Sequence, residues 1–381
     1  MIEGLARRIG LILASGLLVA GLVWTLRAQI LRPTGISLDI GDPAETALRL
    51  PASYRSGVFA SGLAGPRFMA LAPDGTLVVA ERGADRVVAL PDRDGDGRAD
   101  ETLVVGSGYD AAHSVAFEAS GTMLVAGTTR VARVTLGPGL RERAREVIVD
   151  GLPRGGHETR TVLARGDGFL LSVGSSCDVC FEEDRRRAAV LHYAPDGTGG
   201  RVVMAGLRNA VGLAADPATG RVWATVMGRD RLGDDLPPET LYEIVQGADA
   251  GWPRCHAGTI VDPEFGSRPD PASGAVGCAG VAAPAATFQA HSAPLGLAVW
   301  RGYLVIAFHG SWNSSRKVGY ELRRLPWAEG PTGASESFAD GFLDRQTERS
   351  TGRPAGLIVG ADDALYLSDD KAGYIYRITG P

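Results

Sequence analysis

The chain has 381 residues, of which 45% are hydrophobic and 22% are charged, a balance typical of globular proteins and not of disordered ones. Its 52 glycines follow no period of three, which excludes a collagen-like chain and indicates many tight turns. The formal net charge of −5 argues against a nucleic-acid partner bound through bulk charge, and because Lys317 and Lys371 are the only lysines, any anion site has to rely on arginine.

The N-terminus carries the features of a targeting segment. Arg7 and Arg8 precede an uncharged, apolar run from Ile9 to Leu26. This run is longer than the ~7–15 residues of a signal-peptide core and close to the ~17–25 residues that span a bilayer. We therefore expect residues 1–33 to be a signal peptide or, with a slight preference, an uncleaved membrane anchor. The body would then be periplasmic or otherwise extracytoplasmic, either free or tethered to the inner membrane.

The rest of the chain repeats one unit six times. Each unit has a polar residue, a short apolar run, a tight turn and a second apolar strand. The turns of the six units lie at Gly75, Gly121, Gly168, Gly220, Gly302 and Asp363. Several of these intervals match the ~40–50 residues of a four-stranded propeller blade, and third strands follow in every unit. The sequence therefore predicts an all-β, six-bladed β-propeller over residues 34–381, with Gly57–Ala60 completing the last blade.

One interval is much longer than the others and predicts an insertion over about residues 228–290. It contains Cys255 and Cys278, whereas Cys177 and Cys180 lie in an earlier unit. Four cysteines allow three pairings, and the two close pairs are the simplest choice for an oxidising compartment. A zinc site of all four is disfavoured because the second pair lacks a short spacing. No helix pattern follows Cys177–Cys180, which disfavours a thioredoxin-like redox role.

An acidic turn resembles the first part of a calcium-binding loop. Asp92, Asp94, Asp96 and Asp100 alternate with other residues around Gly97, but Leu103 stands where the loop would need a bidentate glutamate. We expect either a structural Ca²⁺ in an outer loop or a solvated acidic turn.

Polar side chains stand where the innermost strand of each blade begins. In a propeller these positions surround the mouth of the central channel. The residues there are Arg67, His113, His157, Arg208, Asn209, His291 and Arg353. Polar or cationic groups repeated at one position of every blade favour a ligand site, and their charge favours an anionic ligand.

The order of motifs along residues 50–380 resembles the soluble-type pyrroloquinoline quinone (PQQ)-dependent sugar dehydrogenases, most closely their L-sorbosone dehydrogenase-like branch. The motifs include GGHETRT, SVGSSCDVC, GLRNAVGL, GRDRLGDDLPP, HSAPLG, FHGSWN and GRP, beginning at Gly155, Ser172, Gly206, Gly228, His291, Phe308 and Gly352. Each motif is weak alone, and their order together is fairly specific. Val211 and Met227 stand where other members often have polar residues, which leaves the sugar open.

The resemblance implies a cofactor site over the propeller mouth, with PQQ and Ca²⁺. It implies that His157 takes the proton of the sugar C1 hydroxyl while hydride passes to the quinone, and that Arg208 stabilises the charge growing there. The other residues that it places at the cofactor are Asn209, Arg353, His113, Arg160, His291 and Arg67. The metal would bind the carbonyls of Gly228 and Arg229, near Asp234 or Asp235. His309 is a further candidate contact.

The sequence thus predicts a PQQ- and Ca²⁺-dependent oxidoreductase that acts on an aldose or aldehyde sugar and passes electrons to a quinone or cytochrome. Two alternatives stay open. One is a calcium-dependent, lactonase-like hydrolase, which the histidines and arginines of the inner positions disfavour. The other is a non-catalytic propeller that binds a partner or glycan.

Overall fold

The computed structural model describes residues 48–381, and the targeting segment predicted for residues 1–33 lies outside this range. The regular structure of the described residues is β-strand, apart from the short 3₁₀ helices η1 (Arg82–Ala84) and η2 (Pro138–Leu140). Within residues 48–381 no helix has the length and hydrophobicity that a membrane span requires.

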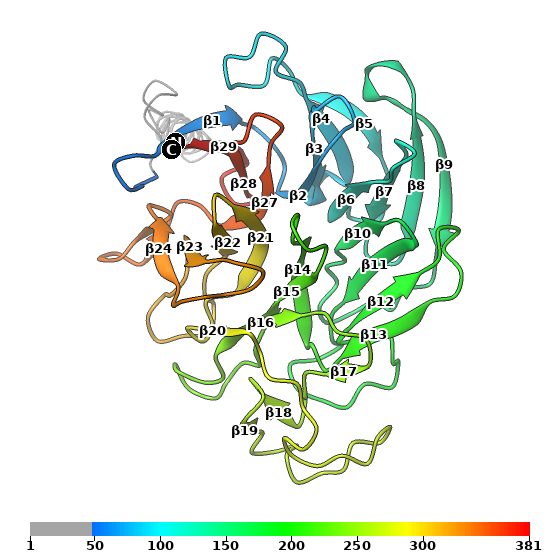
Figure 1. The fold of residues 1–381 in the computed structure, drawn as a ribbon, viewed down its shortest axis with the longest axis vertical. Helices are drawn as coiled ribbons and strands as arrows, with labels where there is room; N and C mark the ends of the chain where they lie inside the picture. The colour runs from blue at the N-terminus through cyan, green and yellow to red at the C-terminus, as the bar shows by residue number, and fades with distance from the viewer. Residues whose placement is uncertain (1–47) are drawn as a thin grey trace, which may run out of the picture. The chain divides into compact units, whose positions relative to one another are not determined.

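Six antiparallel sheets form the blades of a propeller, which confirms the predicted fold (Figure 1). Blade 1 contains β2 (Pro66–Leu71), β3 (Leu77–Glu81), β4 (Arg86–Leu90) and β5 (Leu103–Ser107). Blade 2 contains β6 (Ser114–Phe117), β7 (Met123–Ala126), β8 (Val131–Leu136) and β9 (Glu142–Val149). Blade 3 contains β10 (Val162–Arg165), β11 (Gly168–Val173), β12 (Ala189–Tyr193) and β13 (Arg201–Ala205).

The remaining blades follow the same plan. Blade 4 contains β14 (Asn209–Ala215), β15 (Val222–Met227), β16 (Glu239–Glu243) and β20 (Ala286–Phe288). Blade 5 contains β21 (Pro294–Trp300), β22 (Tyr303–Phe308), β23 (Glu321–Pro326) and β24 (Glu336–Ala339). Blade 6 contains β27 (Pro354–Val359), β28 (Leu365–Asp369), β29 (Tyr374–Thr379) and, as its outer strand, β1 (Arg55–Ala60).

Blade 6 closes the ring with strands from both ends of the described chain. β1 pairs antiparallel with β29, from Arg55 opposite Thr379 to Ala60 opposite Ile375. The prediction that residues 57–60 complete the last blade is therefore confirmed, and the strand begins two residues earlier than expected.

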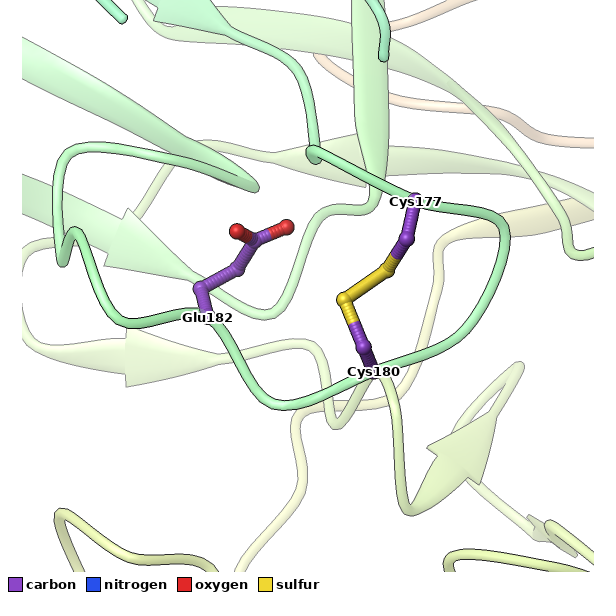
Figure 2. A group of neighbouring side chains, drawn as sticks. All are labelled: Cys177, Cys180 and Glu182. Carbon is purple, nitrogen blue, oxygen red and sulfur yellow. A yellow bond between two sulfur atoms is a disulfide. The ribbon is translucent and has the colours of Figure 1, made fainter. Parts of the chain in front are cut away.

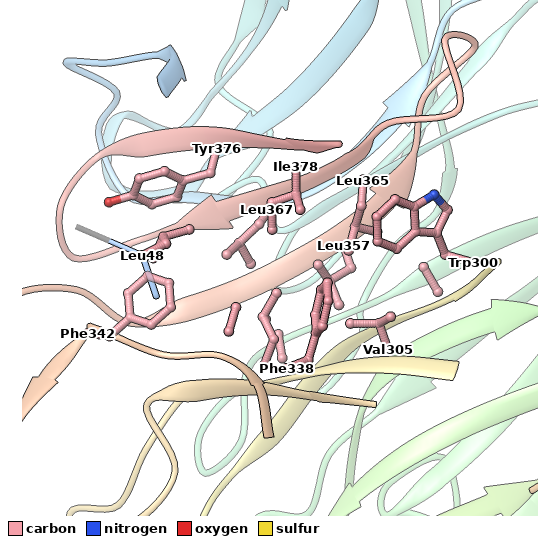
Figure 3. Close-up of a cluster of buried hydrophobic side chains, with 14 of the residues drawn as sticks. Leu48, Trp300, Val305, Phe338, Phe342, Leu357, Leu365, Leu367, Tyr376 and Ile378 are labelled. Atoms are coloured by element: carbon pink, nitrogen blue, oxygen red, sulfur yellow. The ribbon is translucent and has the colours of Figure 1, made fainter. Parts of the chain in front are cut away.

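The core consists of apolar clusters that lie between neighbouring blades. Figure 3 shows the cluster between blades 5 and 6, where Trp300 and Phe338 from blade 5 face Leu357, Leu365 and other residues of blade 6. Corresponding clusters join blade 1 to blade 2, blade 2 to blade 3, and so on around the ring. Each blade is therefore stabilised mainly by its neighbours, as expected for a repeat architecture.

The long interval after β15 forms an insertion at the outer side of blades 3 and 4 (Figure 1). It contributes β17 (Ala248–Asp249), which pairs in parallel with β13, and the hairpin β18 (Cys255–His256) with β19 (Ile260–Val261).

Cys255 and Cys278 form one disulfide, and Cys177 and Cys180 form the other. Both predicted pairs are confirmed, and the disfavoured four-cysteine zinc site has no free thiol among the described residues. A second hairpin, β25 (Leu343–Asp344) with β26 (Arg349–Ser350), precedes blade 6.

Candidate active site

One face of the ring gathers the predicted site residues. In five blades the residue at the start of the inner strand pairs with the last residue of the second strand, as with Asn209 opposite Met227 and Pro354 opposite Asp369. The starts of the inner strands and the loops between second and third strands therefore share one face, which we call the mouth. All the predicted inner-strand residues lie there. His157 lies further from its strand than expected, in the loop before β10.

His157 is half-buried and held by Ser175, which is completely buried. The His157 backbone N–H donates to the Ser175 carbonyl at 2.8 Å, and the ring Nδ1 lies 2.9 Å from Ser175 Oγ. Ser175 Oγ donates its one hydrogen to the Cys177 carbonyl at 2.6 Å. Burial, and next the charge of Arg208, lower the pKa of His157 to about 4, so the ring is neutral over most of the physiological range.

Arg208 lies beside His157, and its side chain is almost fully buried. Its Nε donates to the Asp178 carbonyl at 2.9 Å, and its Nη2 contacts the carboxylates of Asp178 and Asp230 at 2.8 and 3.1 Å. The backbone φ of Arg208 is +26°, a conformation that costs a non-glycine residue about 1–3 kcal/mol. Such strain is maintained only where the surrounding structure fixes the residue, and it is frequent at functional sites.

Asp178 lies within the loop that the Cys177–Cys180 disulfide closes. Figure 2 shows this loop, with the Glu182 carboxylate beside the two sulfur atoms. Glu182 Oε1 accepts the backbone N–H of Ser176 at 2.6 Å. The two cysteine sulfur atoms and the Glu182 carboxylate lie close together, but the disulfide joins both sulfur atoms and leaves no thiolate to bind a metal ion.

A cationic cluster borders the mouth next to blades 1 to 3. His113 is completely buried, packs against Phe68 with the two ring centroids 5.0 Å apart and the planes tilted by 56°, and lies near Arg67, Arg82 and Arg160. Burial, with the charges of these arginines, keeps the pKa of His113 well below its ordinary value. Both ring nitrogens of His113 and the Nε atoms of Arg67 and Arg160 are buried without a hydrogen-bond partner. Buried polar atoms without partners are uncommon, and four in one cluster indicate a place where a ligand or water binds.

Arg160 has a different set of partners from the one that we expected. Its Nη1 donates to the carbonyls of His157 and Thr159, and its Nη2 donates to the carbonyl of Pro153. Burial, and next the charge of Arg187, lower the pKa of Arg160 to about 10. Arg160 thus braces the loop that carries His157, and its unpartnered Nε is the atom left for a ligand.

A second charged group lies at blades 5 and 6 and joins the first cluster through Arg67. Arg353 donates to the carbonyls of His309 and Gly310 at 3.0 and 2.6 Å, while His309 Nε2 lies 2.9 Å from Asp370, which also pairs with Arg67. Burial lowers the pKa of His309 to about 4 despite this carboxylate. Burial disfavours the charge on Asp370, but the hydrogen bond from His309 and the charge of Arg67 prevail and lower its pKa to about 2.

Apolar side chains form a floor under the mouth. Phe68, Val211, Leu295 and Ala355 come from four inner strands and pack together with Met227 at the edge. Val211 is 1% exposed, so its role is packing. Asn209 is also buried, and its Nδ2 lies 3.3 Å from Met227 Sδ.

The loop predicted to bind calcium lies at the same face. The Gly228 backbone N–H donates to Oε2 of buried Glu239 at 2.7 Å, and Arg229 Nη1 contacts Asp262 at 2.5 Å. Burial raises the pKa of Glu239 to about 7. His291 Nε2 lies 2.7 Å from the Gly233 carbonyl, which fixes this histidine against the loop.

The two aspartates expected near the metal lie further along this loop and are exposed. Asp234 accepts the backbone N–H of Ser315 at 2.9 Å and pairs with its hydroxyl. Among the described residues, neither Asp234 nor Asp235 joins a cluster of three side chains able to share a metal ion. The backbone carbonyls of Gly228 and Arg229 stay the predicted ligands.

The acidic turn predicted to bind structural calcium lies on the opposite face, after β4. The carboxylates of Asp92, Asp94 and Asp96 lie close enough to share an ion, and Asp92 accepts the backbone N–H groups of Gly95 and Gly97. Asp100 accepts the backbone N–H of Arg93 instead. This turn is therefore separate from the mouth, and its metal stays a prediction.

Sequence reasoning missed several residues of the mouth. Ser175 and Asp178 stood inside a motif that we read for its cysteines, although their polar side chains flank Cys177. Arg82, Asp230 and Asp370 lie in the loops between second and third strands. The signal that could have found them is topological, because those loops share a face with the inner-strand starts in every blade.

Comparison with known proteins supports one family. The TrAA12-like family model matches residues 48–236 and 256–381. A pyrroloquinoline quinone-dependent pyranose dehydrogenase of Coprinopsis cinerea is 25% identical over 398 residues, covering 86% of this chain and 54% of that protein. The chain spans a little over half the length of the first curated relatives that it matches.

Solved structures share the fold. The holo form of the PQQ domain of the Coprinopsis cinerea pyranose dehydrogenase has a TM-score of 0.77 at 23% identity, covering 87% of this chain and 97% of that one. A calcium structure of a Trichoderma reesei carbohydrate-active enzyme of family AA12 has a TM-score of 0.76 at 21% identity, covering 89% and 98%.

Proposed function

The chain belongs to the TrAA12-like family, and from this premise we propose that it is a PQQ-dependent dehydrogenase that oxidises a pyranose or a related aldehyde sugar at C1. The relative from Coprinopsis cinerea carries a name of this kind. The observation that carries the proposal is His157, a neutral imidazole at the mouth whose Nδ1 is engaged by Ser175. An imidazole held in this way is suited to take a proton.

The residues of the mouth fit an anionic quinone. Buried nitrogen donors without partners at Arg67, His113 and Arg160 favour carboxylates, which accept hydrogen bonds and balance positive charge. When bound, PQQ would supply the acceptor for the two electrons that leave C1 as hydride. We propose that Arg67, His113, Arg160, Asn209, His291 and Arg353 hold it.

His157 and Arg208 would have different roles at the reacting carbon, His157 as the base and Arg208 as the group that stabilises negative charge. The C1 hydroxyl would give its proton to His157 Nε2 as the C–H bond breaks, so that the sugar leaves as the lactone. Arg208 keeps a fixed positive charge beside this histidine. Of its three nitrogens, Nη1 makes the longest hydrogen bond, 3.4 Å to the Met227 carbonyl. That nitrogen is the one free to stabilise negative charge that develops in the transition state.

We propose Ca²⁺ at the carbonyls of Gly228 and Arg229, because hard oxygen ligands suit this ion. The Asp230 carboxylate lies at the same loop and supplies negative charge, Glu239 accepts the Gly228 N–H there, and the AA12 neighbour has a calcium structure. The ion would act as a Lewis acid on the quinone carbonyl.

The partners and the compartment follow from the chemistry. Turnover needs an acceptor for the electrons, which we propose to be a quinone or a cytochrome. Two disulfides favour an oxidising, extracytoplasmic compartment. The apolar run of residues 9–26 would deliver the chain there and could tether it to the membrane.

The test is titration of the purified chain with PQQ, with and without Ca²⁺, by calorimetry, followed by dye reduction with a panel of pyranoses. We expect saturable binding that Ca²⁺ strengthens, and loss of about 10²–10⁴ in kcat for His157→Gln. The acidic limb of kcat/KM should lie near pH 4, since His157 acts only when unprotonated and its pKa is about 4.

His192→Gln is the matched control, because His192 lies on β12 of the same blade and contacts Asp167, away from the mouth. This variant should keep its activity. Absence of PQQ binding under every Ca²⁺ condition would overturn the proposal. A chain that instead hydrolyses lactones with Ca²⁺ alone, or only binds glycans, would establish one of the two alternatives.

A further inference from the structure

We propose that the loop from Ser175 to Cys180, in which the Cys177–Cys180 disulfide closes a short ring, is the positioning element for both His157 and Arg208. Ser175 fixes which ring nitrogen of His157 carries the proton, and Asp178 fixes the guanidinium of Arg208. The consequence for turnover rests on the proposed function, whereas the effect on the two side chains does not.

Ser175 determines the tautomer of His157. Its hydroxyl has one hydrogen, which goes to the Cys177 carbonyl at 2.6 Å. The same oxygen lies 2.9 Å from His157 Nδ1 and therefore accepts a hydrogen bond from it. A neutral imidazole carries one proton, so Nδ1 bears it and Nε2 keeps a free lone pair. Without the serine hydroxyl, nothing at this position would favour the tautomer with the proton on Nδ1.

Asp178 fixes the guanidinium of Arg208 through its backbone and its side chain. Its carbonyl accepts hydrogen bonds from Arg208 Nε at 2.9 Å and from Trp252 Nε1 at 3.2 Å. Its Oδ1 accepts from Arg208 Nη2 at 2.8 Å and from the Asp230 backbone at 2.7 Å. A fork held at two nitrogens has a defined orientation. The positive φ of Arg208 also requires such support.

The Cys177–Cys180 disulfide links the orientation of His157 to that of Arg208. The carbonyl that accepts the serine hydrogen bond belongs to Cys177, and Asp178 is the next residue, so both lie in the short ring that the disulfide closes. This ring lies in the loop between β11 and β12, and neither cysteine belongs to the apolar clusters between blades. Opening it should therefore loosen His157 and Arg208 and leave the propeller folded.

The first test determines the tautomer of His157 in the cofactor-free protein by NMR. The chain is labelled with ¹⁵N-histidine, and His157 is assigned by comparison with His157→Gln. At pH 7 the long-range ¹⁵N–¹H correlations should give a proton on Nδ1 in the wild type and a mixture of both tautomers in Ser175→Ala. Ser176→Ala is the matched control, because Ser176 is exposed and its hydroxyl contacts only Cys180 Sγ, at 3.6 Å. A proton on Nε2 in the wild type, or an unchanged spectrum in Ser175→Ala, would overturn the proposal.

The second test opens the disulfide and follows turnover. The double variant Cys177→Ser/Cys180→Ser should lose about tenfold in kcat with little change in KM, because neither residue contacts the sugar in this proposal. Its urea midpoint should stay close to that of the wild type. A phosphine reductant should lower kcat in the wild type and in Cys255→Ser/Cys278→Ser, because both contain the Cys177–Cys180 disulfide. It should not lower kcat in Cys177→Ser/Cys180→Ser any further.

The outcomes separate this proposal from the proposed function. Full kcat in Cys177→Ser/Cys180→Ser, with its fold intact, would overturn the role of the ring. If the chain oxidises no sugar, the tautomer experiment still decides the role of Ser175. Asp178→Asn, which keeps Oδ1 and removes the charge, should retain more activity than Asp178→Ala, and equal activities would overturn the role of that side chain.

Discussion

Gly174 leaves room for the candidate base His157 and for Asn209, which both lie against its backbone. A Cβ atom at this position would lie 2.5 Å from His157 Cβ and 2.7 Å from Asn209 Oδ1. Contacts this short do not occur between real side chains, so any larger residue has to displace His157 or Asn209. The sequence motif around Gly174 thus has a steric reason in addition to its place in the family resemblance.

We predict that Gly174→Ala lowers kcat at least tenfold by moving His157, while the chain still folds. Gly166→Ala is the control in the same blade, because a Cβ there meets no atom within 4 Å. Steady-state kinetics with PQQ and a pyranose measure the difference, and circular dichroism reports the fold. Equal kcat in the two variants would show that the crowding at Gly174 does not position His157.

Strand β1 is the element that joins the two ends of the described chain into one blade. It adds to β29 along five paired positions and brings Phe59 against Tyr366, with ring centroids 4.9 Å apart at an edge-on angle. Phe59 is 4% exposed, in the cluster between blades 6 and 1. A ring of blades held mainly by its neighbours depends on this closure.

We predict that Phe59→Ala destabilises the chain by about 3–5 kcal/mol, the usual cost of removing a buried phenylalanine side chain. Val104→Ala is the comparison, because Val104 lies on the outer strand β5 and is 42% exposed, so its effect should stay within about 0.5 kcal/mol. Urea unfolding followed by tryptophan fluorescence gives both values. Equal midpoints for the two variants would show that the cluster between blades 6 and 1 contributes little to the stability of the chain.

At the scale of the whole molecule, the sequence was sufficient for the fold because each blade repeats the same alternation of strand and turn. The repeat located His157, Arg208 and Arg353 at the mouth through their position in the unit. It could not assign Ser175 and Asp178, because their roles depend on hydrogen bonds between a loop and two distant strand starts. The acidic pair Asp234 and Asp235 was matched to the metal by nearness in sequence, whereas the fold turns Asp234 towards Ser315.

The mouth also affects the stability of the whole molecule. Burial holds the pKa of His113 well below its ordinary value and lowers the pKa values of His157 and His309 to about 4. In the unfolded chain these rings titrate near pH 6.5. Between pH 6.5 and 4 the unfolded state therefore binds more protons, and stability falls as the pH falls. Glu239 acts in the opposite direction, because its pKa is raised to about 7 in the folded state.

We predict that the cofactor-free chain takes up protons on unfolding near pH 5, so that its free energy of unfolding falls as the pH falls, by about 1.4 kcal/mol per pH unit for each net proton. Urea midpoints at several pH values between 7.5 and 4.5 measure this slope. His113→Phe removes one buried titrating ring, and its slope should be smaller than that of the wild type. Stability that stays constant or rises on acidification from pH 6.5 to 5 would contradict a mouth built from neutral, buried histidines. A slope that His113→Phe leaves unchanged would show that His113 takes no part in this proton uptake.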